Sequence, residues 1–347
     1  MTPAGASPED CGPVYIGGLD RSGKTTMAAF LSSHPRIAIP QVGSNMWTYF
    51  YGQYGTLELD SNLERCLDAL MHYKHVRFLD PDRTRIRSEF LGGPRTYARL
   101  FGLFLQHYAQ RRGKPRWGAQ TGLIERYAGP MFAAYPGLRI VQMVRDPRDR
   151  YEASLARWPD GRGRAGGAVA RWRYSVGLAE RNLRRYPGRY KVVRFETMVE
   201  RPEETIRDVC EFLGERFDPV MLSMTDSPKQ RDRLAGGSVL APSVIPLSVE
   251  HIGLFRGRVP WPEIAFIQLH ARRQMDAYGY AREVIAMSSG DRVRFVARDW
   301  PNQAARMTAW RVIEAAQQRF PGKFGRKPGR RMLVQAEGAA NYPEVVT

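Results

Sequence analysis

The sequence predicts an α/β protein built on a parallel, doubly wound sheet. Short apolar runs of strand length alternate with stretches whose apolar residues recur every three or four positions, the pattern of successive βαβ units. The first apolar run leads into a glycine-rich loop and then a helix. The chain has 347 residues, which is enough for one large α/β domain with or without appendages.

The first half of the chain begins with its clearest unit. PVYIGG at 13–18 is an apolar run that ends in glycines, and KTTMAAFLSSH at 24–34 has helical spacing. Further along, we expect a turn and strand at 34–40, mostly helices over 57–112, a strand end or loop at 116–122 and a short, proline-broken helix at 124–136.

The second half continues the alternation. LRIVQMV at 138–144 predicts a buried strand, which RDPRD stops, and a helix follows from near Arg148. The helix at 201–214 has Pro202 near its start and Gly214 past its end, the expected asymmetry. The remaining expected elements are a strand at 189–196, a polar loop rich in glycine and proline at 227–246, and an amphipathic helix at 262–280.

The chain divides into three regions by composition. Residues 1–12 resemble a flexible leader, 13–290 form the main domain with a helical insert at 44–112, and 291–347 form a basic extension with one helix and a disordered tail. The extension holds 11 basic and five acidic residues. We favour a helix docked on the core with a solvated tail; the alternative is peripheral contact with anionic lipid at the inner membrane face.

Composition and charge limit the function classes. A net charge of +18 suggests nucleic acid, but only seven of the 53 basic residues are lysine and the charge is spread along the chain. We therefore expect small anionic ligands and no nucleic-acid partner. No stretch approaches the apolar length of a membrane span, and the N-terminus lacks the pattern of a signal peptide, so we expect a cytoplasmic protein. The sequence does not fix the oligomeric state.

Neither the cysteines nor the histidines form a recognisable site. The three cysteines are far apart and odd in number, which favours buried thiols over a disulfide framework. The six histidines lack the spacing of metal ligands, and we expect no metal.

The loop GLDRSGKT at 18–25 matches the phosphate-binding pattern G-x-x-x-x-G-K-[ST]. Backbone amides that lead into a helix N-terminus attract phosphate through aligned dipoles, and Gly18 and Gly23 allow the backbone to approach an anion closely. Lys24 and Arg21 add positive charge. This chemistry alone fits ATP, GTP or another nucleotide anion.

A second anion-binding candidate follows the strand at 138–144. Arg145 stands at the carboxyl end of this strand, and Ser154 lies on the following helix. An arginine and a hydroxyl are a typical phosphate clamp. Two alternatives remain open: Arg145 pairs with Asp146 or Asp149, or Asp146 holds a magnesium ion as in a kinase.

Four stretches together resemble sulfotransferases that use 3′-phosphoadenosine 5′-phosphosulfate (PAPS). IGGLDRSGKTTMAAFLSSHPRI resembles the phosphosulfate loop of that family, and VRDPRDRYEAS resembles its 3′-phosphate motif. VVRFETMVERPEETIRDVCEFLGERFDPVM and MDAYGY resemble two later family segments. Their order and spacing over residues 14–280 carry the resemblance.

The resemblance implies a nucleotide-kinase-like, three-layer P-loop fold and a function. The protein would transfer a sulfuryl group from PAPS, as co-substrate and without a metal, to a hydroxyl or amine of a carbohydrate, lipid or small-molecule acceptor. Lys24, Arg21 and Glu125 are the expected catalytic residues. The expected PAPS-binding residues are Arg21, Ser22, Gly23, Lys24, Thr25, Thr26, Arg145, Ser154, Phe195 and Arg256.

Three departures from the family pattern affect these expectations. Lys24 replaces the first threonine of the usual pair, and Ser154 lies nine rather than eight residues after Arg145. No general base can be transferred from the family, and the candidates are His72, His75, His107 and Glu125. Within the insert, Trp47, Tyr49 and Tyr51 are candidates either for the acceptor pocket or for the core.

Two other functions remain as alternatives. GLDRSGKTT and DRYEAS also resemble motifs of thymidylate kinase, although RDPR separates the second motif from its strand and the chain lacks a TREPGG-like segment. The second alternative is a P-loop or nucleic-acid-binding protein without enzymatic activity.

Overall fold

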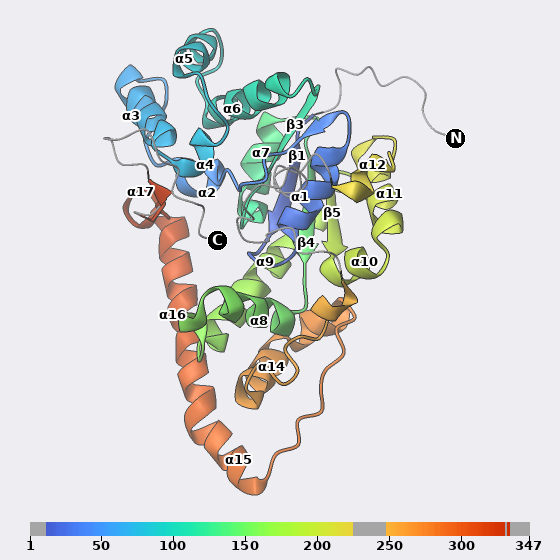
Figure 1. The fold of residues 1–347 in the computed structure, drawn as a ribbon. Helices are drawn as coiled ribbons and strands as arrows, with labels where there is room; N and C mark the ends of the chain where they lie inside the picture. Colours follow the sequence, from blue (N-terminus) through green and yellow to red (C-terminus); the bar gives the residue numbers. More distant parts are fainter. Residues whose placement is uncertain (1–11, 225–247, 330–331, 334–347) are drawn as a thin grey trace.

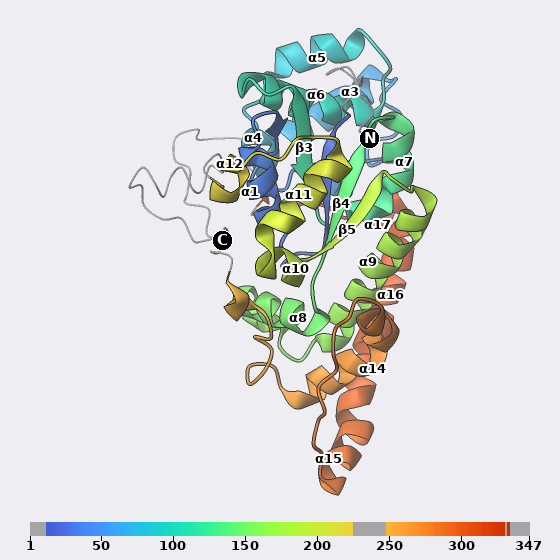
Figure 2. The same cartoon turned by 90° about the vertical axis from the view of Figure 1, so that its right-hand side faces the viewer.

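A five-stranded sheet with helices on both faces forms the centre of the computed structural model (Figure 1 and Figure 2). The structure describes residues 12–224, 248–329 and 332–333, so the expected leader, the 227–246 loop and most of the expected tail lie outside the described residues. The strand order is β2-β3-β1-β4-β5 and all pairs are parallel. The strands are β1 (Val14–Gly18), β2 (Ile37–Ala38), β3 (Arg116–Gln120), β4 (Arg139–Val144) and β5 (Tyr190–Arg194). The predicted α/β class and parallel sheet are confirmed.

Central strand β1 is buried on both faces, as expected of a parallel sheet. Val14 and Ile16 join the apolar cluster on one face, whereas Tyr15 joins the cluster on the other. The first face is covered by α1 (Lys24–Ser33), α10 (Phe195–Glu200), α11 (Pro202–Leu213) and α12 (Val220–Ser223). Gly214 adopts φ 73° directly after α11 and ends it as the sequence predicts.

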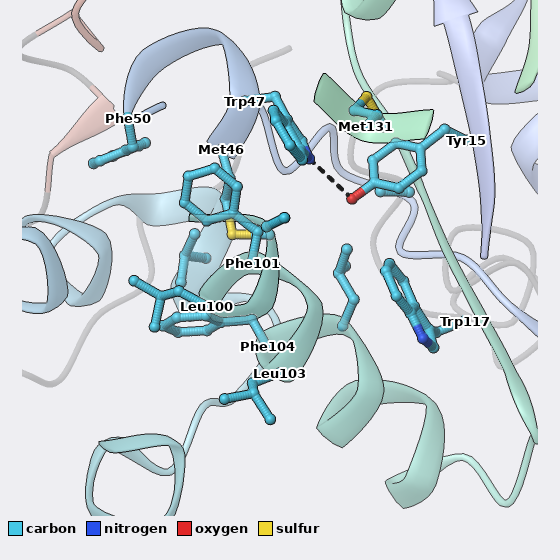
Figure 3. Close-up of a cluster of buried hydrophobic side chains, with 14 of the residues drawn as sticks. Tyr15, Met46, Trp47, Phe50, Leu100, Phe101, Leu103, Phe104, Trp117 and Met131 are labelled. Carbon is cyan, nitrogen blue, oxygen red and sulfur yellow. Dashed lines mark hydrogen bonds between the residues drawn. The ribbon is translucent and has the colours of Figure 1, made fainter. Parts of the chain in front are cut away.

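The opposite face carries the insert and a large aromatic core (Figure 3). Its helices are α2 (Met46–Tyr49), α3 (Asp60–Met71), α4 (Lys74–Arg77), α5 (Arg83–Leu91), α6 (Tyr97–Arg111), η2 (Ile124–Tyr127), α7 (Ala128–Ala134) and α9 (Ala165–Arg185). Trp47 is buried in this core, where its indole N–H donates a 3.2 Å hydrogen bond to the Tyr15 hydroxyl. Of its two open assignments, Trp47 therefore belongs to the core.

A third group of helices packs below the carboxyl ends of the strands. It comprises α8 (Pro147–Arg157), η3 (Pro159–Gly161), η4 (Val249–His251), α14 (Trp261–Ala277), α15 (Ser289–Arg294), a π-helical turn η5 (Phe295–Asp299) and the first part of α16 (Trp300–Arg319). Helix α17 (Pro321–Phe324), at the far end of α16, lies level with the sheet (Figure 1 and Figure 2). Helix α16 lies along α9 in both views (Figure 1 and Figure 2). The C-terminal extension is therefore docked through its helix.

Two helical features differ from the sequence prediction. Helix α9 was not predicted, because its glycines and arginines obscure its apolar spacing. A Cβ on Gly166 would lie 1.9 Å from the Gln303 carbonyl oxygen, so this glycine allows α9 and α16 to approach closely. The extension, expected to hold one helix, is preceded by α15, which begins at Ser289 after a capping box formed by Ser288 and Asp291 and leads through η5 into α16.

Candidate functional site

The loop between β1 and α1 has a backbone conformation that favours glycine. Gly18 and Gly23 have φ angles of 115° and 94°, and Arg21 has a φ angle of 67°. A Cβ on Gly18 would lie 2.3 Å from the carbonyl oxygen of Met143 at the end of β4. Gly23 is the N-cap of α1 and no side chain caps that end, so the first amide groups of the helix can bind an anion.

Lys24 is the first residue of α1, and its buried ammonium group turns back over the loop. Its Nζ donates a 2.8 Å hydrogen bond to the Gly18 carbonyl and lies 3.5 Å from the Asp20 carboxylate. Desolvation lowers the pKa of Lys24, while Asp20 opposes this shift. Desolvation acts to raise the pKa of Asp20, but the charges of Lys24, Arg171 and Arg150 outweigh it and hold that pKa well below its usual range.

The hydroxyl groups of the loop tie it to its surroundings. Ser22 is buried and donates a 2.7 Å hydrogen bond to the Leu19 carbonyl. Thr25 donates a 3.2 Å hydrogen bond to the side-chain oxygen of Gln120, the last residue of β3. The Gln120 amide in turn donates a 2.6 Å bond to the Gln41 carbonyl. Hydrogen bonds therefore connect the loop to the end of β3.

Arg145 follows β4 directly, Phe195 follows β5 directly, and their side chains lie against each other. The Arg145 guanidinium lies 4.3 Å from the centre of the Phe195 ring. Its two terminal nitrogens donate to the carbonyls of Arg21 at 3.3 Å and His251 at 2.8 Å, while its buried Nε has no partner among the described atoms. Desolvation lowers the pKa of Arg145.

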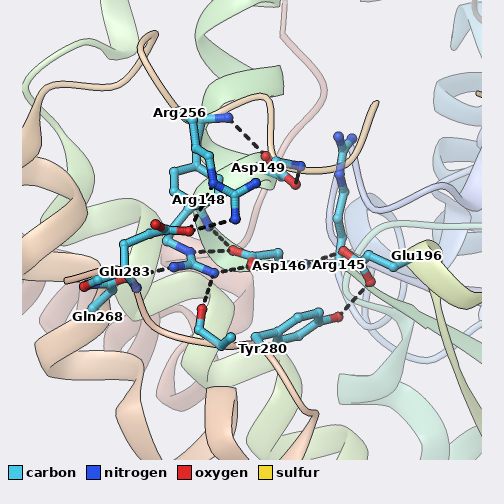
Figure 4. A network of polar contacts seen from close by, with 12 residues as sticks. Arg145, Asp146, Arg148, Asp149, Glu196, Arg256, Gln268, Tyr280 and Glu283 are labelled. Atoms are coloured by element: carbon cyan, nitrogen blue, oxygen red, sulfur yellow. Dashed lines mark hydrogen bonds and ion pairs between the residues drawn. The ribbon is translucent and has the colours of Figure 1, made fainter. Parts of the chain in front are cut away.

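The acidic residues after Arg145 have partners of their own (Figure 4). Asp146 caps α8 and binds the Arg148 guanidinium at 2.6 Å. Asp149 accepts hydrogen bonds from the amides of Gly253 and Phe255. Because Asp149 thus fixes the segment that contains His251, it indirectly positions Arg145, and neither aspartate is hydrogen-bonded to the Arg145 guanidinium itself.

These residues surround one cleft of about 410 Å³. It is lined by Asp20, Arg21, Gly23, Lys24, Thr25, Thr26, Tyr49, His75, Arg145, Trp158, Phe195, His251 and Met332. The structure therefore brings the phosphate-loop residues, Arg145 and Phe195 together, although they come from three different strand ends. Tyr49 joins them from the insert, whereas Tyr51 packs 4.8 Å from Trp47, between ring centres.

Four of the expected site residues lie outside this lining, and the first is Ser22, which is buried and bonded to the Leu19 carbonyl. The Ser154 hydroxyl donates a 2.9 Å hydrogen bond to the Arg150 carbonyl and lines a neighbouring hollow. Arg256 is exposed and pairs with Glu283 at 2.6 Å. Glu125 is buried and accepts a hydrogen bond from the Ser175 hydroxyl.

His75 is the one candidate base from the insert that lines the cleft. Its Nδ1 lies 2.6 Å from the Gly43 carbonyl oxygen. Because a carbonyl only accepts hydrogen bonds, Nδ1 carries the proton and Nε2 is the basic nitrogen of the neutral ring. Burial lowers the pKa of His75. His72 and His107 instead bind the Asp68 carbonyl and the Glu89 carboxylate.

Sequence reasoning missed three residues of the cleft. Trp158 follows α8 directly, His251 lies on η4, and Met332 belongs to the C-terminal extension. Of these three residues, Trp158 alone lies close in sequence to a recognised motif, the 3′-phosphate-like segment that ends at Ser154. His251 and Met332 reach the cleft through tertiary contacts that no nearby pattern indicates.

Within the described ranges, no group of three or more histidine, cysteine, aspartate or glutamate side chains is arranged to hold a metal ion. Nor does any helix in this part of the chain have both the length and the apolar character needed to span a membrane. Cys66 and Cys210 are buried free thiols, as expected, and Cys11 lies outside the described residues.

Comparison with known proteins adds independent information. The family model described as "Sulfotransferase family" matches residues 13–219, which contain the loop, Arg145 and Phe195. A comparison with curated proteins gives no match.

Two solved structures share the fold. The sulfotransferase domain of the olefin synthase of Synechococcus PCC 7002 is 18% identical, with a TM-score of 0.53 over 78% of this chain and 94% of that one. The sulfotransferase domain from the curacin biosynthetic pathway is 15% identical, with a TM-score of 0.50 over 78% and 99% of the two chains.

Proposed function

Since the chain belongs to the sulfotransferase family, we propose that it transfers a sulfuryl group from PAPS to a hydroxyl or amine of a small-molecule, lipid or carbohydrate acceptor. One observation supports the choice of PAPS as the donor. Arg145 at the end of β4 meets the anion-binding loop in a single cleft, with the Phe195 ring beneath its guanidinium. Two separate anion sites beside an aromatic ring suit a nucleotide with phosphate groups at both its 5′ and 3′ positions.

The residues of the cleft fit such a donor. The loop amides and Lys24 would hold the 5′-phosphosulfate, and Arg145 would hold the 3′-phosphate. The buried Nε atoms of Arg21 and Arg145 have no partner among the described atoms, and an incoming phosphate would supply one. Phe195 would offer its ring to the adenine, as the resemblance implies.

The proposed chemistry is an in-line attack of the acceptor on sulfur. The S–O bond to the nucleotide phosphate breaks as the bond to the acceptor oxygen or nitrogen forms, and negative charge develops on the leaving phosphate oxygen. Lys24 and the loop amides are fixed donors at that position, and such donors stabilise the transition state more than the ground state.

We assign the general base to His75 rather than to Glu125. His75 lines the cleft, and its Nε2, which has no hydrogen-bond partner among the described atoms, would accept the acceptor's proton. Glu125 is buried away from the cleft lining and is hydrogen-bonded to Ser175. Asp20 lies in the cleft, but its depressed pKa makes it a poor base. His251 lies on the Arg145 side, where the nucleotide would bind.

Calorimetric titration tests the donor assignment. We expect the full chain to bind 3′-phosphoadenosine 5′-phosphate (PAP) and not ATP–Mg²⁺. Arg145→Ala should weaken PAP far more than it weakens AMP, which lacks the 3′-phosphate, and Arg184→Ala, on an exposed part of α9, should change neither. Tight ATP–Mg²⁺ binding without PAP binding would support the kinase alternative instead, and equal losses for PAP and AMP would refute the role of Arg145.

A further inference from the structure

A second hollow of about 370 Å³ adjoins the donor cleft. Helix α8, η3 and the first turns of α9 form most of its wall, and Trp310 of α16 closes one side. Asp20 and Trp158 line both the hollow and the donor cleft. A ligand in the hollow would therefore lie next to a donor bound at the loop.

Three arginines line this hollow, and one of them has a buried nitrogen without a partner among the described atoms. Arg150 is 95% buried, and its guanidinium donates from Nε to the Asp20 backbone carbonyl at 3.2 Å. Arg171 reaches the Asp20 carboxylate at 3.4 Å, and its own buried Nε has no partner among the described atoms. Arg164 adds a third, exposed guanidinium at the rim.

Positive charge exceeds negative charge at this position. Among the residues that the structure describes, Asp20 is the single carboxylate that lines the hollow, and it is already shared between Arg171 and Lys24. Desolvation, followed by the charge of Arg171, lowers the pKa of Arg150 to about 10. Burying cations without enough counter-charge is costly, so an anion that bound here would relieve the imbalance.

The remaining lining is apolar and aromatic. Trp158 is half-exposed, and it stands with Leu155 and Trp310 around the arginines. An apolar wall beside a cationic end fits a ligand that carries an oxyanion on a ring or an aliphatic body.

We propose that this hollow binds an oxyanion of the acceptor substrate, so that the enzyme sulfates a molecule that already carries a carboxylate, sulfate or phosphate group. The inference rests on the proposed function, because it gives the acceptor of that reaction a chemical class. Arg150 and Arg171 anchor the oxyanion, and the acceptor extends past Trp158 toward Lys24 and His75.

The 3′-phosphate of the nucleotide is another oxyanion that fits this hollow, because Ser154, an expected 3′-phosphate-binding residue, also lines it. Saturating the protein with PAP distinguishes an oxyanion of the acceptor from the 3′-phosphate of the nucleotide. If the hollow belongs to the acceptor, it stays available in the PAP complex; if it belongs to the nucleotide, PAP fills it.

The test titrates phenyl phosphate into the PAP-saturated full chain and follows binding by calorimetry and by tryptophan fluorescence. We expect binding that weakens at least tenfold in Arg171→Gln and remains within twofold in Arg184→Gln, which removes the same charge from an exposed part of the same helix. PAP affinity should stay within threefold in both variants. Arg150→Gln provides a second variant, and Trp158→Phe should reduce the fluorescence change while binding persists.

Two results would overturn the proposal: phenyl phosphate fails to bind the PAP complex, or Arg171→Gln binds it as well as the unaltered chain does. Failure of PAP itself to bind would contradict the donor assignment alone. The same titration of the protein without PAP then tests the hollow, and a loss in Arg171→Gln that does not occur in Lys24→Met would support it.

Discussion

The ammonium group of Lys24 lies 3.5 Å from the carboxylate of Asp20, four residues earlier in the same loop. Asp20 also contacts Arg171 at 3.4 Å, so one carboxylate joins the cation of the donor site to a cation of the neighbouring hollow. An anion that binds at the loop competes with Asp20 for Lys24. Asp20 therefore partly neutralises the site before its ligand arrives.

Asp20→Asn should strengthen PAP binding. The amide removes a negative charge that repels the phosphate, and a unit charge about 4 Å away is worth about 1 kcal/mol in water, or roughly fivefold in affinity. Calorimetry at low and moderate salt measures this change, which salt should reduce. Asp160→Asn, an exposed carboxylate in η3, is the control and should have little effect. Weaker PAP binding in Asp20→Asn would contradict this account.

Lys24→Met should affect the chemical step more than it affects donor binding. In the proposed mechanism the ammonium group stabilises the charge that develops on the leaving oxygen, and losing one such donor costs about 10²–10³ in rate. Single-turnover transfer from radiolabelled PAPS gives the rate, and PAP calorimetry gives the affinity. Lys24→Arg, which keeps the charge, should restore part of the rate. A loss confined to PAP affinity would show that Lys24 only binds the donor.

His75 should titrate below the ordinary histidine pKa. Burial favours the neutral ring, so the form that can accept a proton predominates at pH 7 and is lost only as the pH falls below about 6.5. An NMR titration of the histidine ring protons measures this directly, and His75→Asn identifies the signal. The asparagine amide can still donate to the Gly43 carbonyl, so the fold should persist.

The activity of the same variant tests the role of His75. His75→Asn should lower kcat/KM by about 10²–10⁴ and remove its acid limb, as expected when a general base is lost. The control is His72→Asn, because His72 is exposed and bonded to its own helix. An acid limb that survives in His75→Asn would assign the proton transfer to another group.

The sequence predicted the parts of the site that depend on local patterns. The loop 18–26 and Arg145 lie in the motifs that predicted them, and parallel strands bring their carboxyl ends to one edge. Ser154 shows where this reasoning fails. Successive helical residues are about 100° apart, so one extra residue between Arg145 and Ser154 turns its hydroxyl to a different side of α8. Ala153 occupies the position eight residues after Arg145.

Other parts of the cleft depend on contacts distant in sequence. His251 contacts Arg145 from a segment that Asp149 binds through the backbone of the following residues, Gly253 and Phe255. Met332 reaches the cleft because the long C-terminal helix runs back along α9. Neither position has a pattern of its own, so a single sequence could not have indicated them.

Gly23→Ala should weaken both the fold and the donor site. Gly23 has a φ of 94°, and an added Cβ would lie 2.6 Å from a ring carbon of Phe195. A positive φ alone costs an alanine about 1–2 kcal/mol, and the clash displaces the ring beneath Arg145. Urea unfolding and PAP calorimetry measure the two effects. Gly177→Ala, on helix α9 with open space around it, should be neutral or stabilising.

Glu314→Gln should release the C-terminal segment from the cleft. Glu314 is buried on α16 and pairs with Arg126 from η2 and with Arg326, at 3.0 Å, from the segment that leads to Met332. Removing one partner of a buried ion pair leaves uncompensated charge and costs about 3–5 kcal/mol. Desolvation, followed by the charge of Arg171, lowers the pKa of Arg326, so the charge left behind would face another cation.

Urea unfolding and hydrogen exchange at residues 326–329 and 332–333 measure the effect of Glu314→Gln, and exchange at these residues should increase. Glu203→Gln breaks an exposed pair with Arg207 on α11 and should cost no more than about 1 kcal/mol. If the two variants lost the same stability, Glu314 would not anchor the segment. If Glu314→Gln lost stability while exchange at 326–329 and 332–333 stayed unchanged, Met332 would be held in the cleft by other contacts, such as the backbone bridge between the next residue, Leu333, and Tyr73.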